Sequence, residues 1–118
     1  MSEHQEQTAL IAWATLAARV YPALRLLFAI PNGGARDAVT GALLKAEGVR
    51  PGVPDLCLPV ARHGYHGLYI EMKDRGGKVS RAQRVWMTDL AAEGYRVEVC
   101  YGWEQARETL ESYLEGTL

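Results

Sequence analysis

Two short apolar runs, each with charged residues at one end, constrain the fold of this chain most. The first spans 56–60 and follows Pro54-Asp55; the second spans 67–73 and reads GLYIEMK. Runs of this length and composition, bounded by Pro and Gly, predict β-strands. Glu71 and Lys73 are two residues apart, so on a strand their side chains point to the same face, about 7 Å apart along it.

If the two runs pair as a hairpin, Asp55 reaches Glu71 and two carboxylates converge beside one ammonium group. Hard cations such as Mg²⁺ prefer oxygen ligands and keep several waters, and the carbonyl of Met72 is a further candidate ligand. The spacing therefore predicts a Mg²⁺ site, which Mn²⁺ can also fill, that activates water for phosphodiester hydrolysis. Lys73 would position that water or stabilise the phosphate's developing charge. An exposed Glu–Lys pair, with Asp55 capping a strand, is the alternative.

Composition and length favour one compact domain, which we place at residues 1–118. The chain is 48% hydrophobic, sufficient for a packed core. No apolar run approaches the roughly 20 residues of a membrane span, so we expect no membrane partner. The polar, acidic N-terminus is unlike a signal peptide, and we expect a cytoplasmic protein. Cys57 and Cys100 lie in apolar segments and are predicted to be reduced and buried.

Charge is unevenly distributed along the chain. The net charge is −1, and the last 26 residues contain six acids and two bases. Five bases and one acid lie within 73–84; the bases are Lys73, Arg75, Lys78, Arg81 and Arg84. A local basic patch can bind phosphates although the whole chain is near neutral. A solvated loop and helix start is the equally simple reading.

The order of predicted elements indicates an α/β fold. Helices are expected from a Ser2 cap to about Val20 and over 37–47, 80–93 and 102–113, and strands over 25–30, 55–60, 68–73 and 96–101. A mixed β-sheet flanked by helices is the layer arrangement that buries these faces. Two histidines in the connection at 62–67, His63 and His66, are expected at the surface. Trp13 and Trp86 are expected to pack inside, and Trp103 is a candidate for an interface.

Five motifs occur in the order found in one nuclease family: Asn32-Gly33-Gly34, 52–56 (GVPDL), 70–73 (IEMK), Ser80-x-x-Gln83 and Gly94-Tyr95-x-Val97. On these residues the chain resembles the VRR-NUC domain, a member of the PD-(D/E)XK superfamily with an αβββαβ core. The resemblance covers about residues 6–114. The chain is similar to the minimal, stand-alone form of the domain found in bacteriophages.

The resemblance implies a metal-dependent DNA nuclease. Asp55, Glu71 and Lys73 fall on the family's catalytic motif, and Gln83 falls on a glutamine that faces the site. The family also places a helix-one glutamate near the metal, for which Glu6 is our first choice and Glu3 the second. A solvated helix N-terminus is the alternative for both glutamates.

Several residues are candidate DNA contacts because of their charge or their place in a turn or at a helix start. The Asn-Gly-Gly turn would bring backbone N–H groups to a phosphate, or it is a plain tight turn. The helix start at Ser80 would hold a phosphate, or Ser80 is a simple N-cap. The full set of predicted contacts is Asn32, Gly33, Arg36, Lys45, Arg75, Lys78, Ser80, Arg81 and Arg84.

These expectations combine into one functional hypothesis with two rivals. Small stand-alone members of the superfamily commonly dimerise, so the resemblance implies a homodimer. Because a two-fold dimer presents two sites to one branch point, we expect an endonuclease that cuts branched DNA such as a four-way (Holliday) junction. One rival is a non-catalytic DNA-binding or packaging-accessory module. The other is an exonuclease or nickase of the same fold.

Overall fold

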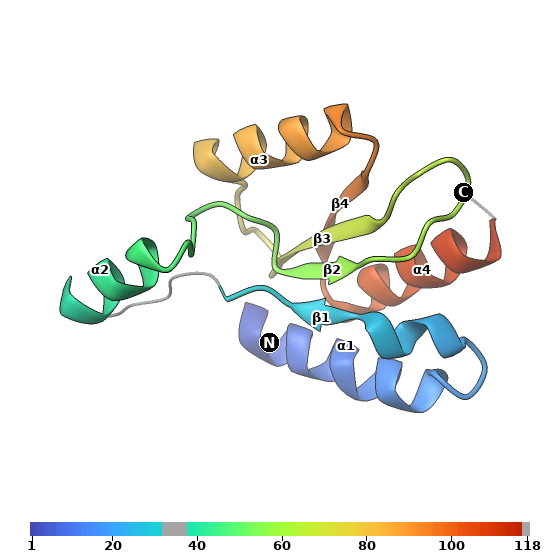
Figure 1. The fold of residues 1–118 in the computed structure, drawn as a ribbon. Helices are drawn as coiled ribbons and strands as arrows, with labels where there is room; N and C mark the ends of the chain where they lie inside the picture. Colours follow the sequence, from blue (N-terminus) through green and yellow to red (C-terminus); the bar gives the residue numbers. More distant parts are fainter. Residues whose placement is uncertain (32–37, 117–118) are drawn as a thin grey trace.

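The computed structural model describes residues 1–31 and 38–116 (Figure 1). Ser2 caps the first helix through a capping box with Gln5, as the sequence predicts. The elements in chain order are α1 (Glu3–Ala17), the 3₁₀ helix η1 (Pro22–Leu26), β1 (Phe28–Ala29), α2 (Ala38–Ala46), β2 (Leu56–Leu58), β3 (Leu68–Lys73), α3 (Arg81–Ala92), β4 (Arg96–Tyr101) and α4 (Trp103–Glu115).

The four strands form one mixed sheet in the order β1-β2-β3-β4. Strand β2 runs antiparallel to both β1 and β3, while β3 and β4 are parallel. The parallel pair is joined through α3, because a parallel connection must cross over the sheet. This arrangement confirms the predicted α/β fold with a mixed sheet and flanking helices.

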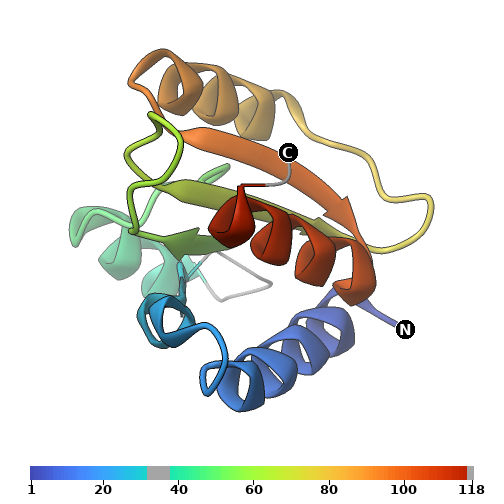
Figure 2. The same cartoon turned by 90° about the vertical axis from the view of Figure 1, so that its right-hand side faces the viewer.

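Helices cover the two faces of the sheet unequally (Figure 2). Alternate residues of β3, namely Leu68, Ile70 and Met72, join the main core with residues of α1 and α4 such as Leu10 and Leu110. Tyr69, Glu71 and Lys73 therefore point to the opposite face, which α3 covers. The core lies on one side of the sheet, and polar side chains can occupy the other.

The sequence predicted the cysteines correctly but the first strand wrongly. Cys57 and Cys100 are free thiols and are buried. The strand expected over 25–30 is reduced to Phe28–Ala29, and the preceding residues form η1. Proline fixes φ near the helical value and suits the first turn of a helix, so Pro22 begins η1 and Leu24 enters the core.

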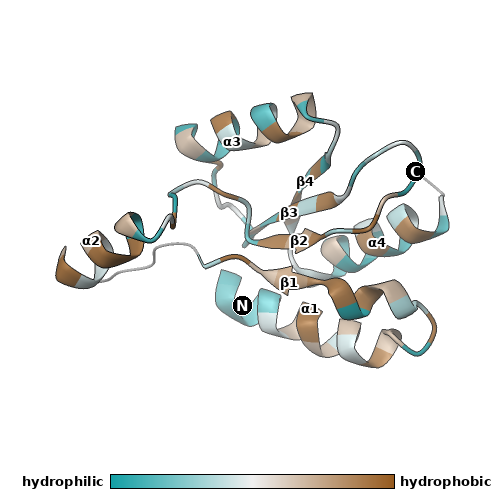
Figure 3. Cartoon of the chain, viewed as in Figure 1, coloured by the Kyte–Doolittle hydropathy of each residue, from teal (hydrophilic) through white to brown (hydrophobic). Residues whose placement is uncertain are grey.

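Helix α2 projects from the body of the protein (Figures 1 and 3). It has no buried residue, and its apolar side chains Val39 and Leu43 are 71% and 61% exposed. The apolar face of α2 thus has no partner within the described part of the chain. None of the helices described is long and apolar enough to cross a membrane.

Candidate active site

The sheet brings the two predicted carboxylates together. Leu56 pairs with Ile70, and one step further along the antiparallel ladder sets Asp55 opposite Glu71. The Met72 N–H donates to Oδ2 of Asp55 at 2.7 Å, so the side chain of Asp55 replaces a main-chain acceptor just before β2 begins. This bond holds the Asp55 carboxylate beside β3.

Glu71 has two carboxylate oxygens in different surroundings. The side chain is 1% exposed, and Lys73 beside it is 6% exposed. Oε2 accepts a hydrogen bond from Nε2 of Gln83 at 3.0 Å and lies 3.5 Å from Nζ of Lys73. Oε1 is buried and has no hydrogen-bond partner. One oxygen is therefore held by the protein, and the other is left for a ligand.

Burial and charge act together on Glu71. Removal from water, followed by the nearby carboxylate of Asp55, raises the pKa of Glu71 from 4.5 to about 8, while Lys73 acts in the opposite direction. A buried charge is costly unless it is paired and hydrogen-bonded. The carboxylate pair thus requires a proton or a cation to be stable near neutral pH.

The N–H and the C=O of Met72 both point from β3 toward β2, where Asp55 lies. The carbonyl of Lys73 accepts from the Gly102 N–H at 3.0 Å, toward the β4 side. Successive peptide units of a strand alternate in direction, so the N–H and C=O of Met72 are directed to the β2 side. The predicted Met72 carbonyl ligand is therefore on the side of β3 where the carboxylates meet.

The donor set fits a hard divalent cation. It offers carboxylate oxygens from Asp55 and Glu71, of which the buried Oε1 of Glu71 has no hydrogen-bond partner, and a main-chain carbonyl from Met72. No group of three or more His, Cys, Asp and Glu side chains with metal-binding geometry occurs in residues 1–31 and 38–116. Mg²⁺ is usually bound by few protein ligands and several waters, whereas a structural zinc site needs four protein ligands.

Two glutamates of α1 lie in different surroundings. Oε1 of Glu6 accepts from the Trp103 N–H at 3.2 Å, so Glu6 caps the N-terminus of α4. Glu3 lines an open cavity of about 590 Å³ whose wall also includes His4, Gln7 and Asp55. Of the two predicted candidates for the helix-one ligand, Glu3 lines the same cavity as Asp55, whereas Glu6 links α1 to α4 through a hydrogen bond.

The predicted DNA contacts that the structure describes are solvent-exposed: Lys45, Arg75, Lys78, Ser80, Arg81 and Arg84. Four of these residues lie in or beside the first turn of α3, and Arg84 also donates to the Val79 carbonyl at 2.9 Å. The predicted contacts Asn32, Gly33 and Arg36 lie outside the described residues.

Ser80 does cap α3, as the simpler reading of its motif expected. Its hydroxyl accepts from the Gln83 N–H at 3.1 Å, and its own N–H donates to Oε1 of Gln83 at 2.8 Å. Gln83 thus belongs to a capping box and to the Glu71 site at once. The S-x-x-Q spacing is a capping-box signal, but it does not reveal that the same amide reaches a buried carboxylate.

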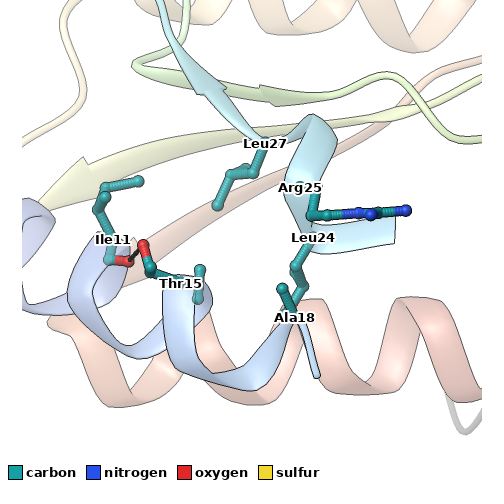
Figure 4. Close-up of a pocket in the computed structure, with 7 residues that line it drawn as sticks. Ile11, Thr15, Ala18, Leu24, Arg25 and Leu27 are labelled. Carbon is teal, nitrogen blue, oxygen red and sulfur yellow. Dashed lines mark hydrogen bonds between the residues drawn. The ribbon is translucent and has the colours of Figure 1, made fainter. Parts of the chain in front are cut away.

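Other predicted features lie away from the carboxylates. His63 and His66 are exposed, as expected, and His63 bonds to the Tyr113 carbonyl at 2.9 Å. Trp13 and Trp103 pack partly buried against the core. Trp86 was expected to pack inside, but it is only partly buried, on a helix (α3) that has no buried residue. A separate cavity of about 260 Å³ between α1 and η1 contains none of the predicted site residues (Figure 4); its lining is Ile11, Ala14, Thr15, Ala18, Leu24, Arg25 and Leu27.

A mixed sheet with an aspartate immediately before one central strand and Glu-x-Lys at the end of its neighbour is typical of the PD-(D/E)XK class of nuclease-type folds. Comparison with known proteins identifies the family within this class. The model of the VRR-NUC domain matches residues 2–104. A solved structure described as "VRR_NUC domain protein" is 27% identical, with a TM-score of 0.77 over 98% of this chain and 89% of that chain. No curated protein matches in sequence. The chain belongs to the VRR-NUC domain family.

Proposed function

We propose that this protein is a metal-dependent endonuclease that hydrolyses phosphodiester bonds of DNA. The observation that carries the proposal is the buried Glu71, with one free oxygen, beside Asp55 and Lys73. A carboxylate in such a place costs stability, and perturbed carboxylates of this kind concentrate at functional sites. The membership of the VRR-NUC family agrees with this chemistry.

The residues of the site divide the work of hydrolysis. Asp55, Oε1 of Glu71 and the Met72 carbonyl would hold Mg²⁺ or Mn²⁺. When bound, the ion lowers the pKa of a water ligand and neutralises charge on the phosphate. The ammonium of Lys73 orients the attacking water and stabilises the charge that develops on the phosphate oxygens. Gln83 keeps the Glu71 carboxylate in position through Oε2.

Charge on the protein surface favours an approach of DNA from the α3 side of the sheet. The exposed bases Lys78, Arg81 and Arg84 lie where α3 begins, close to Gln83 and therefore to Glu71. The acidic helix α4 packs on the other side, where Leu110 and Tyr113 enter the core. Phosphates are thus attracted toward the carboxylates on one face and repelled from the other.

Branched DNA and a homodimer are the specific form of the proposal. The unpartnered apolar face of α2, with Val39 and Leu43 exposed, supports pairing with a second copy. We expect Leu43→Glu to convert a dimer to a monomer in light scattering, with Lys45→Glu as an exposed control on the same helix. A wild-type protein that is monomeric, or that cuts only flaps, would rule out the dimeric junction-cutting form.

The experiment that tests the main proposal is cleavage of end-labelled duplex, flap and four-way junction DNA with Mg²⁺, Mn²⁺ or EDTA. We expect metal-dependent cutting that Asp55→Ala and Lys73→Ala abolish, with DNA binding nearly retained. Glu108→Gln, which removes an exposed carboxylate of α4, is the matched control. Binding without cutting under every metal condition would instead favour a non-catalytic DNA-binding or packaging module. Cutting that requires a free end would indicate an exonuclease, and cuts confined to one strand a nickase.

We also propose that Glu3, rather than Glu6, is the acidic residue of helix α1 nearest the ion, because it shares a cavity with Asp55. Glu6→Gln keeps an oxygen for the Trp103 N–H and should retain Mn²⁺ affinity. Glu3→Gln should weaken that affinity by about tenfold, as losses around metal sites do. A larger loss of Mn²⁺ affinity in Glu6→Gln than in Glu3→Gln would instead identify Glu6 as the acidic residue nearest the ion.

A further inference from the structure

The first turn of α3 contains a continuous set of hydrogen bonds that ends on the Glu71 carboxylate. The Ser80 N–H donates to Oε1 of Gln83 at 2.8 Å, and Nε2 of the same amide donates to Oε2 of Glu71 at 3.0 Å. A backbone group at a helix N-cap is therefore linked to a buried side chain of β3 through one glutamine. The proposed function uses Gln83 but assigns nothing to the Ser80 N–H.

An amide side chain is directional, and its orientation decides whether it helps or opposes a carboxylate. Nε2 is a donor and Oε1 only an acceptor, so a rotated amide would set an oxygen against Oε2 of Glu71. The Ser80 N–H can bond only the oxygen end. It therefore selects the orientation in which the NH₂ group faces Glu71.

We propose that Ser80 is a positioning residue of the active site, acting through its backbone N–H. By fixing the Gln83 amide it holds Oε2 of Glu71, and the other oxygen, Oε1, is then directed to the cation. This inference rests on the proposed function of the carboxylates. The same turn also touches the segment before Asp55, because a Cβ on Gly52 would lie 2.7 Å from the Ala82 carbonyl carbon. The first turn of α3 therefore contacts Glu71 directly and also packs against the segment that leads to Asp55.

Two substitutions at one position separate the N–H from the rest of the cap. Ser80→Ala and Ser80→Pro both remove the hydroxyl, but only Ser80→Pro removes the N–H. The φ of Ser80 is −76°, which proline accepts. We expect Ser80→Pro to bind Mn²⁺ about tenfold more weakly than Ser80→Ala, measured by electron paramagnetic resonance without DNA. Single-turnover DNA cleavage at saturating protein should fall by a similar factor between the two variants.

A repeat of both substitutions in a Gln83→Ala background tests whether Ser80 acts through the amide. The difference between the two should then vanish, since nothing remains to be oriented. Equal Mn²⁺ affinity of the two variants in the Gln83 background, or a difference that persists in Gln83→Ala, would overturn the proposal.

An NMR readout keeps the inference testable if Ser80→Pro does not fold or the wild type binds no Mn²⁺. Hydrogen exchange of the Ser80 N–H should be slow in the wild type and faster by tenfold or more in Gln83→Ala. Unprotected exchange in the wild type, or protection that survives Gln83→Ala, would refute the orienting role. A wild type that shows the protection but neither binds Mn²⁺ nor cuts DNA would refute the proposed function alone.

Discussion

Glu71→Gln should make the metal-free protein more stable at alkaline pH, although it removes a residue of the proposed site. In the wild type, the pKa of Glu71 rises from 4.5 to about 8 on folding because the side chain is buried near Asp55. The folded state therefore keeps a proton that the unfolded state loses. The amide resembles the protonated carboxyl in shape, can still accept from Gln83, and does not titrate.

The sign and size of the effect follow from proton linkage. A raised folded pKa gives stability that is complete below pH 4.5 and is lost as the pH rises through about 8. Each unit of pH in that window lowers the free energy of unfolding by at most about 1.4 kcal/mol, or about 4–5 kcal/mol over the window. Water penetration and relaxation reduce such effects, so we expect about 2–3 kcal/mol in favour of Glu71→Gln at pH 9.

Urea unfolding followed by tryptophan fluorescence at several pH values measures this difference. In EDTA, the stability of the wild type should fall between pH 5 and 9, while that of Glu71→Gln should change less. Adding Mg²⁺ should raise the stability of the wild type more than that of the variant, because ligand binding to the folded state stabilises it. A wild-type profile parallel to that of Glu71→Gln across the range would refute the burial argument.

Three further predictions concern residues around the site and in the core. Gly52→Ala should lower the free energy of unfolding by about 1 kcal/mol or more beyond Gly48→Ala in urea unfolding, because both positions have positive φ but only Gly52 is packed tightly. Arg81→Ala and Arg84→Ala should each weaken DNA binding regardless of sequence and reduce the salt slope by about 1 in filter-binding titrations. Tyr113→Phe should cost about 1–2 kcal/mol in thermal unfolding without changing cleavage, since its buried OH donates to the Val60 carbonyl at 2.6 Å on the far side of the sheet.

Much of the fold and of the carboxylate site could be predicted from local signals. Alternation along the GLYIEMK segment (67–73) placed Glu71 and Lys73 on one face, and the structure has them there. Antiparallel pairing with the run after Asp55 then fixed the partner of Glu71. These features depend on strand periodicity and short connections, which a sequence carries directly.

Features that depend on contacts between distant segments could not be predicted. Glu3 and Glu6 lie on the same helix, and only the position of α4, whose Trp103 N–H bonds Glu6, separates their surroundings. The strand expected over 25–30 is shortened to Phe28–Ala29, and its first two residues belong to η1, because the burial of Leu24 in η1 is a tertiary effect. Helix α2 was correctly expected, but nothing in its sequence shows that it lacks a partner in the same chain.

Strand β3 explains how a chain of this size combines a stable core with a costly site. Its alternate residues Leu68, Ile70 and Met72 are almost wholly buried on the α1–α4 side, where their burial stabilises the sheet. The intervening Glu71 and Lys73 are buried as well, but under α3, where two charged groups are held with few partners. Apolar packing on one face fixes the backbone that the other face needs, so the acidic residues keep their separation without a core of their own. A polar substitution at an apolar position of β3 should therefore reduce both the affinity for the ion and the stability. Glu71→Gln should instead reduce the affinity for the ion while raising the stability of the metal-free protein.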